Sequence, residues 1–129
     1  MATSLQERTE TAVSAYRATQ AELQRLSSTL AQLLTQKHEN EIVKTEMDVL
    51  DSDTVVFKMI GPILVKQDPV EAKNNVEKRL ELITREIQRT DDRIKEVSKE
   101  SEKKKATIVE LQSMMMQQRS EAAKAAAKK

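Results

Sequence analysis

Few residues of this 129-residue sequence could carry out chemistry, because it has no cysteine, one histidine (His38) and one glycine (Gly61). A metal site needs several His, Cys, Asp or Glu ligands at set spacings, and a phosphate-binding loop needs several glycines. His38 has no such partners, so we interpret it as a solvated helix position. Carboxylates on a solvated helix also lack the buried pocket that would shift a pKa usefully. We therefore expect no enzyme activity, no metal and no other cofactor.

The sequence is better suited to binding than to catalysis, because three methionines follow one another at positions 114–116. Methionine is flexible and polarizable, so exposed methionines suit the binding of many unrelated apolar segments. Two interpretations stay open: these side chains cover the seam of a coiled coil, or they bind a partner. Together with apolar residues near both ends of the chain they would form a surface, called the tip here, of Leu5, Ala12, Val13, Tyr16, Ile108, Leu111, Met114, Met115 and Met116.

The composition indicates long helices rather than a globular enzyme. Aromatic residues are 2%, charged residues are 33%, and only one Gly and two Pro interrupt the chain. A formal net charge of +1 disfavours direct binding of nucleic acid, which usually requires a basic excess. The first residues lack the apolar core of a signal peptide, and no stretch approaches the ~20 apolar residues that span a bilayer. We expect a cytoplasmic protein without membrane contact.

Heptad spacing predicts two helices that pair with each other. In the second half, a stripe that steps alternately by three and four residues runs from Leu80 to Gln118, and a weaker stripe runs from Leu5 to Leu33. Such spacing is typical of coiled coils. We predict a register shift between Leu34 and Val43, where the weaker stripe turns polar. Folded back on itself, the chain should place residues whose numbers sum to about 123 opposite each other.

Two polar residues interrupt the stronger stripe, namely Ser101 and Lys104. The antiparallel pairing places Lys104 opposite Thr19 and Ser101 opposite Leu23. Because polar side chains fill a seam poorly, we expect loose packing there.

A β-hairpin is predicted between the helices. Two β-branched runs, Val55–Ile60 and Ile63–Lys66, flank the turn dipeptide Gly61-Pro62. An isolated two-stranded hairpin is marginal in water, and apolar residues occur on both of its faces. We therefore predict that strands of other subunits cover it. The predicted assembly residues are Val55, Val56, Phe57, Met59, Ile60, Gly61, Pro62, Ile63, Leu64 and Val65.

The expected fold is mainly α: a long antiparallel two-helix coiled coil joined by one β-hairpin. The chain should form a single domain, 1–129, made of a helix at 1–50, the hairpin at 54–66, a helix at 68–125 and a tail at 126–129. Asp68 should cap the second helix, with Pro69 at its first position.

The residues around this hairpin resemble a known family. The run IVKTEMDVLDSDTVVFKMIGPILVKQD (Ile42–Asp68) and the following KRLELITREIQR (Lys78–Arg89) resemble β-type subunits of prefoldin. The resemblance implies a hexamer of two α-type and four β-type subunits, whose hairpins form a β-barrel platform. It also implies an ATP-independent cochaperone whose coiled-coil tips hold unfolded clients such as actin and tubulin for the cytosolic chaperonin. Membership of a related complex that shares subunits stays open.

Two other functions fit the sequence less well. A structural coiled coil that binds a folded partner would have little use for an apolar hairpin, since a polar loop would serve. A nucleic-acid or chromatin accessory protein is disfavoured by the near-zero net charge and the scarcity of aromatic residues.

Overall fold

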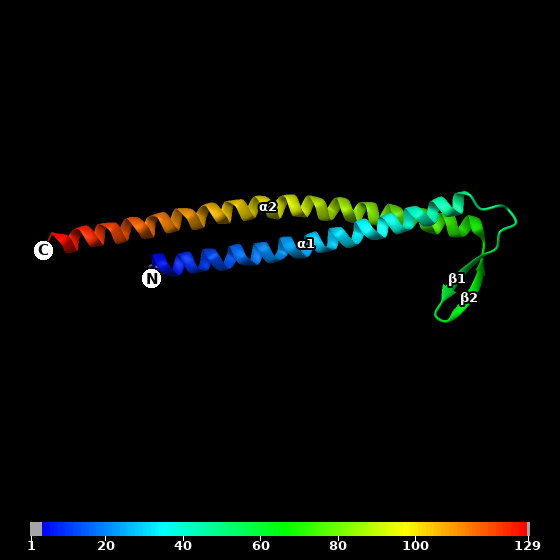
Figure 1. Ribbon diagram of the computed structural model, residues 1–129, viewed down its shortest axis with the longest axis horizontal. Helices are drawn as coiled ribbons and strands as arrows, with labels where there is room; N and C mark the ends of the chain where they lie inside the picture. Colours follow the sequence, from blue (N-terminus) through cyan, green and yellow to red (C-terminus); the bar gives the residue numbers. More distant parts are fainter. Residues whose placement is uncertain (1–3, 129) are drawn as a thin grey trace. The chain divides into compact units, whose positions relative to one another are not determined.

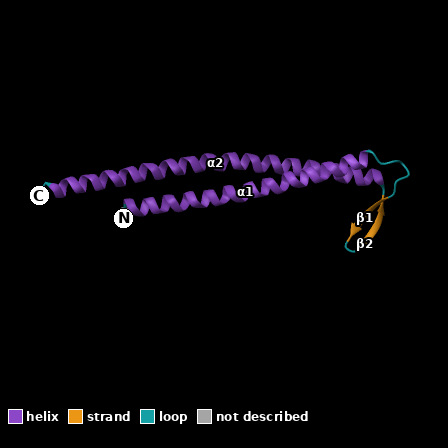
Figure 2. Ribbon diagram, in the orientation of Figure 1, coloured by secondary structure: helices purple, strands orange, loops and turns teal. Residues whose placement is uncertain are grey.

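A computed structural model describes residues 4–128 of the chain. Its elements are helix α1 (Leu5–Asp48), strand β1 (Val56–Ile60), strand β2 (Ile63–Gln67) and helix α2 (Pro69–Ala127), as Figure 1 and Figure 2 show. The first helix ends two residues before the predicted position 50, and the second continues two residues beyond 125. The parts of the predicted first helix at 1–3 and of the predicted tail at 129 lie outside the described residues.

The structure divides into two compact units. The terminal unit combines the chain up to Ser27 with the chain from Asp92 onward, and the hairpin unit is Ser28–Asp91. The terminal unit holds the first part of α1 and the larger part of α2. The hairpin unit holds the remainder of both helices and both strands. Within each unit the two helices run side by side in opposite directions (Figure 1).

The stripe predicted on α2 forms the buried seam of that helix. The buried residues of α2 are spaced by four, seven or ten positions, which are sums of steps of three and four: Ala72, Val76, Ile83, Thr90, Val97, Ser101 and Leu111. This is the 3.5-residue period of a helix that packs against a single partner. Val97 lies deepest, at 0% exposure. The heptad prediction for α2 is confirmed.

The predicted register shift on α1 is wrong. Half-buried positions continue beyond Leu33 in unbroken steps of three and four through Lys37, Asn40 and Lys44 to Met47. Val43, at which the shift was expected to bring the apolar stripe back, is exposed. The physical reason is that a lysine can lay its long aliphatic stem along a seam while its ammonium group reaches water. Polar residues therefore hold seam positions here without moving the helix.

The expected loose packing around Ser101 is also wrong. Thr19 and Ser101 are buried, and hydrogen bonds replace the missing apolar contacts. Lys104 Nζ donates to Thr19 Oγ1 at 2.7 Å, and Gln20 Nε2 donates to Ser101 Oγ at 2.6 Å. We call these four residues the polar layer. It lies within the terminal unit, and its Thr19–Lys104 pair has the predicted antiparallel register.

The hairpin has the predicted two-residue turn. Strands β1 and β2 pair antiparallel, from Val56 opposite Gln67 to Ile60 opposite Ile63. Gly61 has a φ of +58°, and Pro62 fixes its own φ near −65°. A positive φ followed by a negative one is the order found in type II′ turns, whose twist matches that of the flanking strands. The strands differ from those predicted by one residue: β1 begins at Val56, and β2 continues to Gln67.

Polar contacts fix both helix ends next to the hairpin. Asp68 Oδ1 accepts a hydrogen bond from the Val70 amide at 3.1 Å, so this carboxylate caps α2 as predicted. Lys73 in the first turns of α2 lies 2.6 Å from the Asp48 carboxylate, at the last residue of α1. The hydrogen bond from Lys73 lowers the pKa of Asp48, and the same contact raises the pKa of Lys73. The bridge ties the two helices together where the chain leaves them for the hairpin.

Candidate functional site

The hairpin presents a bare apolar surface. Seven of its apolar side chains are between 43% and 73% exposed, and we call this set the hairpin surface: Val55, Phe57, Met59, Ile60, Ile63, Leu64 and Val65. Val56, also predicted for assembly, is half-buried. Figure 2 shows both strands standing apart from the helices. Isolated exposed apolar residues are ordinary, but a contiguous set of this kind marks an interaction site.

Both faces of the hairpin contribute to this surface. Because side chains alternate along a strand, Phe57 and Met59 share one face with Leu64, which is paired to Met59. Ile60 and Ile63, which are paired to each other, lie on the opposite face. Burying both faces requires contacts on two sides, as in the interior of a larger sheet or barrel.

The edges of the hairpin are open as well. The described sheet contains only β1 and β2, so each strand has one edge with unpaired N–H and C=O groups. An added strand can satisfy these groups and cover apolar side chains at the same time. The predicted assembly residues are thus brought together in one element whose edges and faces are both available.

The predicted tip residues lie in the terminal unit but differ in exposure. Met114 and Met116 are exposed, whereas Leu111 is buried. The remaining predicted residues are half-buried: Leu5, Ala12, Val13, Tyr16, Ile108 and Met115. Thr9 Oγ1 lies 3.4 Å from Met115 Sδ, which holds Met115 against α1. Met115 therefore covers the seam, whereas Met114 and Met116 face solvent.

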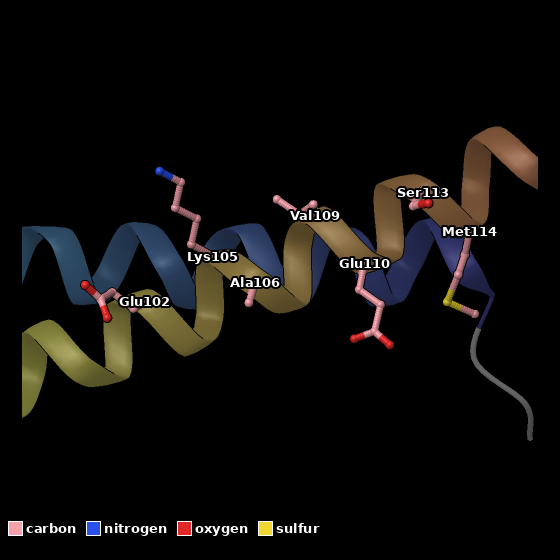
Figure 3. Close-up of a pocket in the computed structure, with 7 residues that line it drawn as sticks. All are labelled: Glu102, Lys105, Ala106, Val109, Glu110, Ser113 and Met114. Atoms are coloured by element: carbon pink, nitrogen blue, oxygen red, sulfur yellow. The ribbon is translucent and has the colours of Figure 1, made fainter.

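One face of α2 carries an open groove in this unit, shown in Figure 3. Ala106, Val109 and Met114 supply its apolar part, and Glu102, Lys105 and Glu110 supply charges around it. Val109 is 57% exposed. Val109 was not predicted from the sequence, because only the heptad stripe was considered on this helix, and that stripe contains the neighbouring Ile108. The signal was available: residues 102, 106, 109 and 113 recur by four, three and four, which is a second helical face.

A second group of exposed apolar residues lies where the helices meet the hairpin. Val49, Leu50 and Val70 belong to this group, and Val70 is 67% exposed. Sequence reasoning missed Val49 and Val70, because they fall outside both the heptad stripes and the strands. Leu50 was predicted to continue the stripe of the first helix after Met47, but it is exposed. The one local indication of this exposed group was Val70, an apolar residue directly after Pro69 at the start of α2.

Neither a metal site nor a membrane span is present in the part of the chain that the structure describes. Within residues 4–128, no group of three or more His, Cys, Asp or Glu side chains could hold a metal ion. None of the described helices is long and apolar enough to cross a membrane.

Comparisons with known proteins agree with this arrangement. The family model described as prefoldin subunit matches residues 10–121. Over 127 residues the chain is 40% identical to prefoldin subunit 6 of Homo sapiens, covering 98% of this chain and 97% of that protein. It is also 40% identical over 128 residues to prefoldin subunit 6 of Mus musculus, covering 99% of both chains.

A solved structure shares the fold. The prefoldin beta subunit from Thermococcus strain KS-1 superposes with a TM-score of 0.72 over 78% of this chain and 89% of that chain. The sequence identity is 18%, so this match concerns the fold alone.

Two antiparallel helices joined by a single apolar hairpin are the fold of a prefoldin beta subunit. The chain belongs to the prefoldin subunit family, a family of chaperone subunits that assemble with other prefoldin subunits. The predicted family and fold class are confirmed.

Proposed function

We propose that this chain is one subunit of a hetero-hexameric prefoldin cochaperone, and that its hairpin surface enters a shared β-barrel platform. The observation that supports assembly through the hairpin is the exposure of apolar side chains on both of its faces, next to two open strand edges. The whole chain would then act as one assembly domain, with other α-type and β-type subunits as its direct partners.

The complex would act by binding and not by catalysis. In this proposal the tip holds exposed apolar segments of unfolded clients such as actin and tubulin, and the cytosolic chaperonin takes the client over. No ATP, metal or other cofactor takes part, and the work is done in the cytoplasm. Support comes from Met114 and Met116 of the tip and from the neighbouring Val109, whose apolar side chains face solvent on α2. Weak contacts at several tips add through avidity.

Assembly is tested by co-expressing the full chain with the five other prefoldin subunits and measuring the native mass of the purified complex. We expect a hexamer for the parent chain. Replacing residues 55–65 by a Gly/Ser linker of equal length should remove this chain from the complex. Incorporation of the linker variant at the parent level would contradict the platform and favour a scaffold role for the coiled coil.

Client binding is tested in the assembled complex with chemically denatured actin, whose aggregation is followed by light scattering. Replacing Met114, Met115 and Met116 by serine should weaken suppression of aggregation while the native mass stays that of a hexamer. The matched control replaces the same three residues by leucine, which keeps the surface apolar and should preserve suppression. Equal suppression by the serine and leucine variants would contradict the role of the tip.

A further inference from the structure

A pocket of about 370 Å³ lies in the hairpin unit, where both helices meet the strands. We call it the basal pocket. Its lining comes from four pieces of chain: the end of α1, the connecting loop, the start of β1, and the segment from Asp68 into the first turns of α2. The residues are Met47, Leu50, Asp51, Ser52, Val56, Asp68, Pro69, Val70 and Lys73.

Apolar side chains form most of this pocket, and solvent reaches them. Leu50 and Val70 are exposed, and Met47 and Val56 are half-buried. Val49, beside Leu50 in the chain, is the most exposed of the large apolar residues of the described chain. An apolar group that fills such a pocket removes this apolar surface from water and so stabilises the complex.

The pocket adjoins the hairpin surface. Val56 lines the pocket and is the first residue of β1, between Val55 and Phe57 of the hairpin surface. A strand that pairs with the open edge of β1 runs along that edge and reaches its Val56 end. The chain that covers the hairpin is therefore brought to the pocket by the same pairing.

The charges around the pocket favour a basic neighbour. Asp51 and Asp68 contribute carboxylates to its lining, and Lys73 is the one cation among the lining residues. Lys73 is already paired with Asp48, at 2.6 Å. Asp68 also caps α2, but the lining still holds two carboxylates against one ammonium group, so its net charge is negative.

We propose that the basal pocket receives an apolar side chain from the hairpin of the neighbouring prefoldin subunit, and that a Lys or Arg beside it faces Asp51 and Asp68. The inference rests on the proposed platform and extends the subunit interface from the strands onto the helix ends. The hairpin then supplies backbone pairing, which any strand can make, and the pocket adds a contact that depends on the identity of the neighbour.

Val70→Asp and Leu50→Asp test the contact in the co-expressed complex. A carboxylate among the apolar lining would be desolvated by the side chain that fills the pocket, and the neighbour's one cation is already shared by Asp51 and Asp68. Each variant should therefore lower incorporation at least about tenfold against co-expressed parent chain. Val70 lies at the start of α2, where an acidic residue suits the helix dipole, so Val70→Asp should fold normally. Leu82→Asp is the control, because Leu82 is comparably exposed (60%) on the same helix but does not line the pocket.

The proposed function and this inference fail in different ways. Ile63→Asp, in β2, tests the platform alone, and its loss from the hexamer supports the platform. If Ile63→Asp is lost while both pocket variants enter like Leu82→Asp, the basal-pocket contact is wrong and the platform stands. If Ile63→Asp enters as well, the platform itself is wrong. Equal loss of Leu82→Asp and the pocket variants would also overturn the pocket contact.

A direct measurement identifies the occupant. A photo-crosslinking residue at position 70 of the full chain, activated in the assembled hexamer, should attach to a hairpin peptide of one neighbouring subunit, as identified by mass spectrometry. Attachment to this chain alone, to denatured actin added as client, or to a small molecule retained from the cell would overturn the proposal.

Discussion

Lys104 Nζ on α2 donates a 2.7 Å hydrogen bond to Thr19 Oγ1 on α1, and Thr19 is only 3% exposed. Thr19 Oγ1 also donates to the carbonyl oxygen of Ala15 at 3.0 Å. The hydroxyl thus accepts from one helix and donates within its own, which satisfies a polar group inside an apolar seam. No buried polar side-chain atom of the described residues is left without a partner.

Making this contact apolar should stabilise the chain. Removing both polar partners at once leaves no unpaired group, and apolar side chains in a seam gain burial energy. The double variant Thr19→Val with Lys104→Leu should raise the free energy of unfolding by about 1–2 kcal/mol. Thermal and urea unfolding, followed by circular dichroism, measure the change. Thr19→Val alone should gain less, because Lys104 loses its acceptor, and a double variant less stable than the parent would refute the expectation.

Val97 should be the most sensitive apolar position of the terminal unit. Its side chain is fully buried, so Val97→Ala removes buried methyl groups and leaves a cavity, at a cost of roughly 2 kcal/mol. Val109→Ala, on the same helix and 57% exposed, should change stability by less than about 0.5 kcal/mol. Urea unfolding of both variants measures the difference. Similar losses at the two positions would show that the seam is not where the structure puts it.

Gly61 should tolerate no ordinary side chain without cost. Its φ is +58°, whereas a Cβ at this position would meet no atom within 4 Å. The cost of Gly61→Ala is therefore conformational rather than steric, about 1–2 kcal/mol on the hairpin. Hydrogen exchange of the strand amides in the assembled complex should speed up accordingly. A D-alanine introduced at position 61 by chemical ligation prefers positive φ and should restore slow exchange; exchange as fast as in the L-alanine variant would argue against this explanation.

The Asp48–Lys73 bridge should make stability depend on pH on the acid side. The folded pKa of Asp48 is lower than its ordinary value of 3.8. The bridge therefore stabilises the folded chain fully above pH 3.8, and this stabilisation is lost as pH falls through the folded pKa. Asp48→Asn should therefore reduce the unfolding midpoint near pH 6, and the difference from the parent should shrink below pH 3.8. Thermal unfolding between pH 2 and 6 tests this.

The partner of this bridge provides the control. Lys73 has a raised pKa. Its ammonium group therefore stabilises the folded chain fully below the ordinary value of 10.5, and this stabilisation is lost only as pH rises through the folded pKa. Lys73→Met should lower the midpoint near pH 6 as Asp48→Asn does, and the double variant should lose little more than either single one. Additive losses would mean that the two residues act separately.

The periodic parts of the molecule could be predicted from the sequence by itself. Apolar positions recur every 3.5 residues along a helix seam, and side chains alternate between two faces along a strand. Both patterns can therefore be recognised from residues close together in the sequence. The seam of α2, the cap at Asp68 and the turn at Gly61 all follow from such local rules. The family resemblance also rested on a contiguous run, the hairpin and its flanks.

Only the tertiary structure decided which polar residues occupy seam positions and which apolar residues lie outside the seam. Lys37 and Asn40 keep seam positions while Val43 lies outside, because a rigid helix pair fixes the register over many turns and a single residue's polarity cannot move it. Thr19 and Ser101 are buried for the same reason and are satisfied by residues more than 80 positions away. The basal pocket likewise joins four pieces of chain, so no local pattern could predict it.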